Sequence, residues 1–76
     1  MQFDIDEFSA NLRALRARKH VSQGEVAAAI GVSSNTVSNY ELGNTSPNYI
    51  VTWKLADYYG VTLDEIGGRT LVKSAD

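Results

Sequence analysis

The sequence predicts an all-α fold made of five short helices. Apolar residues recur at spacings of three and four, which places them on one face of a helix. Helix-start and helix-stop residues also punctuate the chain at short intervals, and no stretch shows a convincing strand pattern. A chain of 76 residues is one domain, which we expect to span residues 4–67 as a compact bundle, followed by a tail over residues 68–76.

The first helix is expected to begin near Asp4 and to end near Lys19. Asp4 with Glu7 three residues later has the form of a capping box, with Asp in place of the more usual Ser or Thr. The apolar face of this helix consists of Ile5, Phe8, Leu12 and Leu15.

The second and third helices follow with only residues 31–33 between them. Ser22 and Glu25 form a capping box at the start of the second helix, and Gly31 ends it, since glycine tolerates the left-handed backbone of a helix stop. Ser33 is a good N-cap for the third helix, which ends at residues 43–44.

The fourth helix is expected to start at residues 46–47, because proline is favoured at the first helical position, and to stop at Gly60. The spacing predicts that Trp53 is in the core or half-buried. The alternative is that Trp53 forms a dimer contact with Tyr58, Tyr59 or Ile66.

The fifth helix is expected to begin at a capping box formed by Thr62 and Glu65, and to close at residues 67–68. The tail that follows has no strong pattern. We expect this tail to be disordered rather than to take part in a dimer.

Composition excludes several classes of protein. The hydrophobic fraction of 43% is typical of a globular domain, and the absence of cysteine excludes disulfides and thiolate metal sites. No apolar run approaches the roughly 20 residues of a membrane span, and the N-terminus lacks the order of a signal peptide, so we expect a soluble, cytoplasmic protein. His20 is the only histidine, and is expected to be a cap or a surface residue. An enzyme is not expected, because most catalytic constellations cannot be built with one histidine and no cysteine, and no metal-ligand cluster, cofactor or phosphate-cradling loop is indicated.

Charge is unevenly distributed along the chain. The net charge is −2, which is unusual for a protein that binds nucleic acid. Four basic residues nevertheless lie close together in one short stretch: Arg13, Arg16, Arg18 and Lys19. Such a run is either a solvated helix face or a local surface for phosphate.

The most informative stretch is residues 23–40. Two helices with so short a link must cross steeply, as in a helix-turn-helix. Such a crossing needs a small residue, for which Ala27 is placed, and a turn residue that tolerates positive φ, which is Gly31. The residues with spacing for inward packing are Val26, Ile30, Val32, Val37 and Tyr40.

Residues 21–33 and 36–43 resemble the Cro/CI-type (XRE) helix-turn-helix family. The similarity runs from about Phe8 to Ile66, and includes Pro47 and residues 60–66. The resemblance implies a phage repressor-like DNA-binding domain, whose second and third helices form the helix-turn-helix at about residues 22–41.

In that family the third helix enters the major groove of duplex DNA. The resemblance assigns base contacts to Ser33, Ser34, Asn35, Thr36 and Asn39. Asparagine can pair bidentately with adenine, and no residue in 33–39 is charged, so specificity would depend on neutral hydrogen bonds. The alternative is that these are polar side chains exposed to solvent without a role in DNA binding, with Ser33 acting only as a helix cap. Base contact is favoured for Ser34, Asn35 and Asn39.

The resemblance also assigns a set of phosphate contacts. Gln23 would clamp a phosphate at the start of the second helix, with backbone N–H groups assisting. Arg16 would both face phosphate and form an ion pair with Glu41. Many relatives carry a basic residue at the position of Asn44, which is neutral, so we expect DNA binding to be weak and salt-sensitive. The other expected phosphate contacts are Ser22, Asn44, Thr45, Ser46 and Asn48.

The sequence thus predicts a sequence-specific transcriptional regulator, and favours a repressor. Its partners would be duplex DNA and a second copy of the chain, as a homodimer on a two-fold operator. Neither a membrane nor a small-molecule substrate is indicated. The alternative is a protein-interaction or antitoxin-type module with the same fold.

Overall fold

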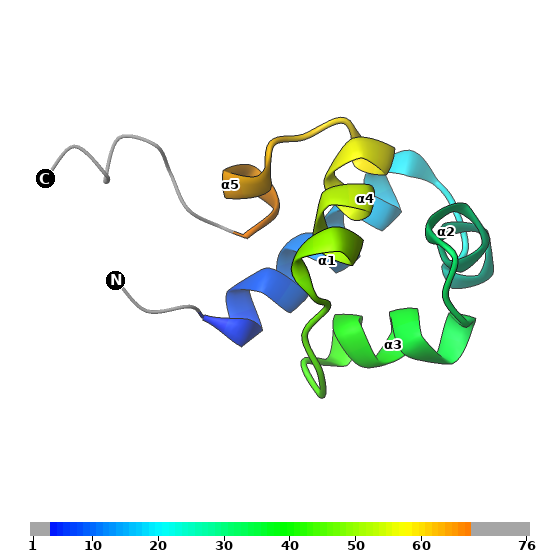
Figure 1. Cartoon of the computed structure of the whole chain (residues 1–76), viewed down its shortest axis with the longest axis horizontal. Coiled ribbons are helices and arrows are strands. Elements are labelled where there is room, and N and C mark those ends of the chain that lie inside the picture. The colour runs from blue at the N-terminus through cyan, green and yellow to red at the C-terminus, as the bar shows by residue number, and fades with distance from the viewer. Residues whose placement is uncertain (1–3, 68–76) are drawn as a thin grey trace, which may run out of the picture.

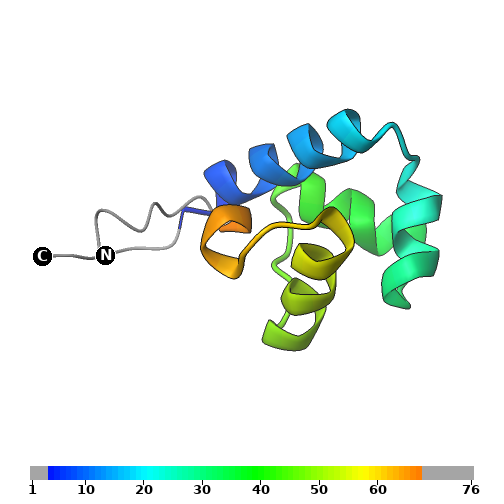
Figure 2. The same ribbon diagram turned by 90° about the horizontal axis from the view of Figure 1, so that it is seen from above.

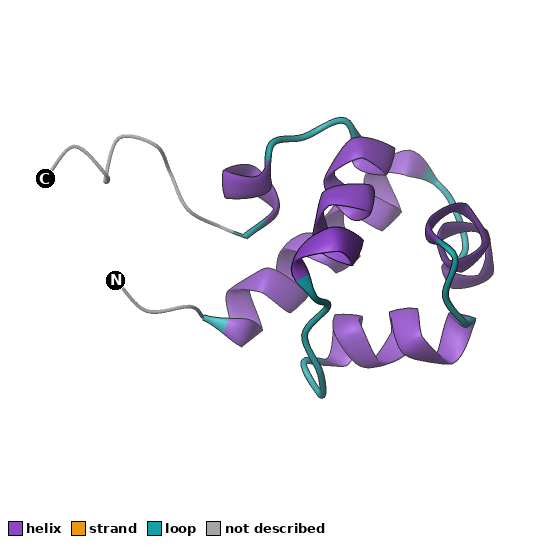
Figure 3. Ribbon diagram, viewed as in Figure 1, coloured by secondary structure: helices purple, strands orange, loops and turns teal. Residues whose placement is uncertain are grey.

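The computed structural model describes residues 4–67 as five helices (Figure 1). These are α1 (Ile5–Lys19), α2 (Gln23–Ile30), α3 (Ser34–Leu42), α4 (Tyr49–Tyr59) and α5 (Leu63–Ile66). Within the described range no strand is present (Figure 3), which confirms the all-α prediction. The predicted tail, residues 68–76, lies outside the described residues.

Local capping chemistry sets most helix ends, as predicted. In α2, Ser22 Oγ accepts from the Glu25 N–H at 3.0 Å, and Glu25 Oε1 accepts from the Ser22 N–H at 2.8 Å. The same reciprocal pair joins Thr62 and Glu65 at the start of α5. At α1 the cap differs, because Asp4 Oδ1 accepts from two successive backbone N–H groups instead of forming a reciprocal box.

The start of α4 was predicted wrongly. The helix begins at Tyr49 rather than at residues 46–47, and its N-cap is Asn48. The amide oxygen of Asn48 accepts from the Val51 N–H at 2.8 Å. An asparagine side chain can satisfy an otherwise orphaned N–H of the first turn, so it determines the boundary, and Pro47 stays in the link.

All five helices contribute to the core. Figures 1 and 2 show α5 beside the first half of α1, while α2 and α3 pack closely at the other end. Ala27 of α2 is buried, which agrees with the small residue expected for a close crossing. The buried apolar residues are Phe8, Leu12, Leu15, Val26, Ala27, Ile30, Val37, Tyr40, Leu55, Ala56 and Ile66.

Trp53 is not in this core. It is 58% exposed, whereas Leu55 on the same helix is fully buried. Residues two positions apart on a helix point about 200° apart, so a residue midway between Val51 and Leu55 faces away from the core. Ile66 is fully buried and is therefore unavailable for the alternative dimer contact.

His20 ends α1 in the left-handed region, at φ 60°, and its side chain is exposed. Both halves of the expectation, cap and surface residue, are confirmed. Of the helices in residues 4–67, none is long and apolar enough to cross a membrane.

Candidate nucleic-acid interface

The turn between α2 and α3 determines how α3 is presented. Gly31 has φ 80°, and its N–H and that of Val32 both donate to the Ala27 carbonyl, at 2.9 and 3.0 Å. This left-handed stop redirects the chain, and Ser33 caps the start of α3 immediately afterwards. In Figure 1, α2 is seen almost along its axis while α3 lies across the view, so the two helices cross steeply. The arrangement is a helix-turn-helix.

The first turn of α3 contains two kinds of polar side chain. Ser33 Oγ accepts from the Thr36 N–H at 3.1 Å and lies 2.8 Å from Thr36 Oγ1, so this pair is engaged in capping. Ser34 and Asn35 are exposed, and their side chains form no hydrogen bond within the described residues. Of the predicted base contacts, Ser34 and Asn35 are therefore the most available.

Asn39 lies one turn after Asn35 and is half-buried. Its amide oxygen accepts from Asn44 Nδ2 at 3.1 Å. The amide N–H groups of Asn39 take no part in this hydrogen bond. The contact also holds Asn44 against the end of α3. Asn39 and Asn44 were predicted to contact bases and phosphate respectively, and the structure brings them together.

The carboxylate of Glu41 joins three helices. It is 4% exposed, and accepts from Arg16 Nε at 2.7 Å, from Arg16 Nη2 at 3.1 Å and from Gln23 Nε2 at 3.0 Å. The ion pair expected between Arg16 and Glu41 is thus present. It connects the last turn of α1 to the last turn of α3, and Gln23 adds the first residue of α2.

Arg16 also donates from Nη1 to the Val21 carbonyl at 3.1 Å, which fixes the link between α1 and α2. Its hydrogen bond to Glu41 raises the pKa of the Arg16 guanidinium above its ordinary value, so the cation persists. Arginine has five N–H donors, and three are used by Glu41 and Val21, so two remain for another acceptor.

Gln23 is half-buried at the start of α2, with its amide nitrogen close to Glu41. One N–H of this amide is used by the carboxylate. The second has no acceptor within the described residues, and Gln23 is the first residue of α2, where backbone N–H groups lack partners within the helix. Gln23 and Arg16 are therefore brought to the same network, adjacent to α3.

Sequence reasoning missed two contributors to this network. Arg13 donates from Nη1 to the backbone carbonyl of Glu41, where a cation suits the carbonyl groups of a helix C-terminus. Its position three residues before Arg16, on the same side of α1, was a signal that could have revealed it. Burial, followed by the negative charge of Glu41, raises the pKa of Tyr59 to about 12, and no sequence pattern indicated this.

The link between α3 and α4 carries the remaining predicted phosphate contacts. Thr45, Ser46 and Asn48 are exposed. The oxygen of the Asn48 amide is used as the α4 cap, so only its nitrogen can donate elsewhere. Within residues 4–67, His, Asp and Glu side chains form no cluster of three that could hold a metal ion.

Known proteins resemble this chain in sequence and in fold. A helix-turn-helix family model matches residues 12–66. The cryptic phage CTXphi transcriptional repressor RstR of Vibrio cholerae is 44% identical over 59 residues, which cover 78% of this chain and 53% of RstR. The HTH-type transcriptional activator BcrR of Enterococcus faecalis is 31% identical over 71 residues, covering 92% of this chain and 35% of BcrR.

The solved structure of the clp gene regulator ClgR from C. glutamicum superposes with a TM-score of 0.74 at 25% identity. The match covers 93% of this chain and 87% of that structure. The chain spans about half the length of RstR and about a third of BcrR. From the family model, the relatives and the fold, the chain belongs to the XRE-type helix-turn-helix family of DNA-binding transcription regulators.

Proposed function

We propose that this chain recognises a specific sequence in duplex DNA by placing the N-terminal half of α3 in the major groove. The observation that carries the proposal is the pair Ser34 and Asn35, exposed and without hydrogen bonds in the described structure, on the first turn of a helix fixed at both ends. Amide and hydroxyl groups in that position match the donors and acceptors of base edges. Asn39 offers its amide N–H groups one turn further along.

Phosphate contacts would position α3. The free N–H groups of Gln23 and Arg16, together with the first backbone N–H groups of α2, form a set of donors beside the reading helix. Ser22 is the cap of the same helix start. The exposed link over residues 44–48 would contact the backbone on the other side of α3, with neutral side chains only.

We infer further that two copies of the chain occupy a two-fold operator and that occupation represses transcription. Helix-turn-helix domains commonly bind as dimers to half-sites about one helical turn apart. Repression is favoured over activation because RstR, a repressor, is 44% identical to the chain while BcrR, an activator, is 31% identical. A repressor needs only to occupy its site.

The test is selection from a random duplex pool at low salt, with the wild type and with Asn35→Ala and Asn39→Ala. Asn11→Ala, on α1, is the matched control, because it removes the same amide outside the α3 face. We expect an inverted repeat, relaxed at one position per half-site by each α3 variant and unchanged by the control. A wild type that enriches no sequence, or α3 variants that select the same site as the wild type, would contradict base reading by α3.

A protein-interaction module is the second candidate. Its support is the net charge of −2 and the neutral side chain of Asn44, a position that the family resemblance assigns to phosphate contact. On that reading the chain binds no DNA at any salt concentration, and a partner protein contacts the α3 surface. The same selection distinguishes the two, since only the DNA-binding function gives an enriched sequence.

A further inference from the structure

Three large apolar side chains gather on the exposed side of α4. Tyr49, Ile50 and Trp53 are 64%, 63% and 58% exposed, and we call them the α4 patch. Their spacing of one, three and four residues puts them on one side of the first turns of the helix. The rings of Tyr49 and Trp53 meet edge to face, with centroids 5.9 Å apart and planes at 80°.

The fold does not need these side chains. α4 packs into the core through Leu55 and Ala56, which are buried and point away from Trp53. A single exposed apolar residue is ordinary, but three close together on one side of a helix, with two aromatic rings in contact, form a patch that water covers at a free-energy cost. Aromatic residues are also enriched at the centres of protein interfaces.

We propose that the α4 patch is the surface through which two copies of this chain contact each other. A two-fold axis brings the same patch of each copy face to face, so an apolar, uncharged patch is complementary to itself. The charged residues next to it, Lys54 and Asp57, have opposite signs, so pairing two copies creates no block of like charge.

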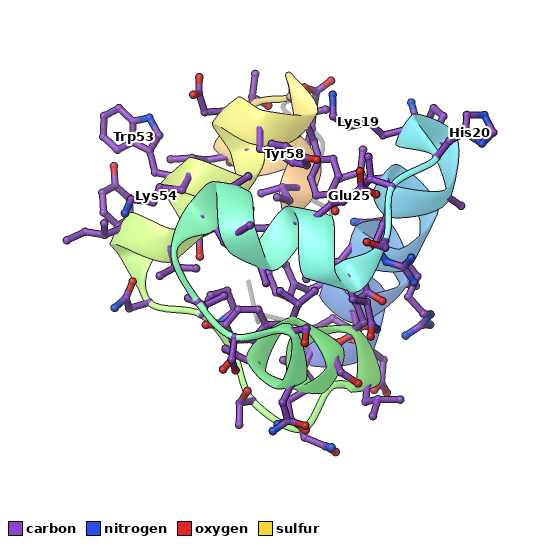
Figure 4. All side chains as sticks on the ribbon, turned by 90° about the vertical axis from the view of Figure 1, so that its right-hand side faces the viewer. Lys19, His20, Glu25, Trp53, Lys54 and Tyr58 are labelled. Atoms are coloured by element: carbon purple, nitrogen blue, oxygen red, sulfur yellow. The ribbon has the colours of Figure 1, made fainter. Side chains whose placement is uncertain are left out.

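The position of the patch suits two copies on one DNA duplex. Figure 4 shows Trp53 and Lys54 on one flank of the domain and His20 on the opposite flank, with α3 along the lower edge. An axis that passes the Trp53 flank leaves both α3 helices directed to the same side, as a two-fold operator requires. The last turn of α1, which His20 ends, is less suitable, because Arg18 and Lys19 are exposed on it and two copies meeting there would bring like charges together.

The size of the patch sets the strength of the contact. Two half-exposed aromatic rings and an isoleucine present roughly 400 Å² per copy, given that an aromatic side chain buries about 150–250 Å². Two copies would bury roughly 800 Å² of apolar area, less than the total of about 1,200 Å² typical of stable complexes. We therefore expect a dimer that is weak in solution and becomes dominant when DNA holds two copies together.

The experiment compares Trp53→Ser with Trp53→Phe in the full chain. The serine variant removes the centre of the patch, whereas phenylalanine keeps most of its apolar area. Because Trp53 is exposed, both variants should keep the helical circular dichroism and the melting temperature of the wild type. Sedimentation equilibrium at millimolar protein should show self-association, weakened about tenfold or more by Trp53→Ser and little by Trp53→Phe.

The second arm uses the selected operator and a duplex with one half-site. This arm rests on the proposed function, whereas sedimentation does not. We expect Trp53→Ser to bind the half-site like the wild type, and the full site about tenfold more weakly, with loss of cooperativity. Patch-dependent self-association without DNA binding would leave the dimer surface standing and reject the proposed function.

Two results would overturn the inference. One is self-association and full-site cooperativity that are the same in Trp53→Ser as in the wild type. The other is a Trp53 emission that acrylamide quenches poorly at micromolar, monomeric protein. That result would mean that another part of the same chain covers the patch.

Discussion

The buried carboxylate of Glu41 makes Arg16→Met the most informative single substitution. Methionine keeps an unbranched apolar stem and removes the guanidinium. Three hydrogen bonds disappear, namely two to the Glu41 carboxylate and one to the Val21 carbonyl. The carboxylate, 4% exposed, then keeps only the bond from Gln23 among the three it accepts in the wild type.

The magnitude follows from this burial. Removing one partner of a buried ion pair costs about 3–5 kcal/mol, because the other charge stays desolvated. The Arg16 side chain is 28% exposed, so water can partly replace it, and we take the lower end, about 3 kcal/mol. At about 4–8 °C per kcal/mol for a domain of this size, the melting temperature should fall by roughly 12–24 °C.

The assay is thermal unfolding followed by far-ultraviolet circular dichroism, since exposed Trp53 is a poor reporter of the core. Glu41→Gln is the matched comparison, because it removes the charge and leaves Arg16 able to turn to water. It should cost less, about 1–2 kcal/mol. Combining Arg16→Met with Glu41→Met should cost clearly less than the sum of the single substitutions. If the effects add, or if Glu41→Gln is the more damaging, the carboxylate does not depend on Arg16 and the reasoning fails.

Three further predictions concern single positions. Gly31→Ala and Gly43→Ala should both strain a left-handed residue by about 1 kcal/mol. A Cβ at Gly43 would lie 3.2 Å from Ser9 Oγ, whereas a Cβ at Gly31 meets no atom within 4 Å. Urea unfolding midpoints should therefore rank Gly43→Ala as the less stable variant. Ser33→Ala should lose about 1 kcal/mol with the α3 cap. Ser33→Asp should keep the cap yet weaken operator binding in mobility-shift assays. If this variant binds the operator as tightly as the wild type, Ser33 does not lie in the major groove. The pKa of Tyr59 is raised from 10.0 to about 12. The folded state therefore keeps its full stability below pH 10 and should lose stability as the pH rises to about 12. Melting curves across this pH range should show a smaller loss for Tyr59→Phe.

The helix ends that could be predicted from the sequence are those where one local signal acts alone. Ser22 with Glu25, and Thr62 with Glu65, specify their helix starts through bonds within four residues. At α4 two signals compete within two residues, proline for the first helical position and asparagine for the cap. Sequence spacing could not rank them, because the outcome depends on the path of the link from α3.

The candidate site shows a similar division. The ion pair of Arg16 with Glu41 joins residues 25 apart and came from the family resemblance, not from periodicity. The bond from Arg13 to the Glu41 carbonyl needs the angle between α1 and α3, which no local pattern contains. Trp53 could have been placed correctly from the phase of α4 against Val51 and Leu55, but hydrophobicity alone suggested the core.

The rigidity of α3 bears directly on how a chain with net charge −2 could select a DNA sequence. Long-range attraction to phosphate is small, since the chain is acidic and Arg16 is already paired. Neutral hydrogen bonds from Ser34 and Asn35 discriminate bases only when their positions are fixed. The Gly31 turn fixes one end of α3, and Glu41, held by α1 and α2, fixes the other. Specificity would then come from the geometry of a held helix, and affinity from two copies joined at the α4 patch. The patch would be as important for operator occupation as the base contacts proposed for α3.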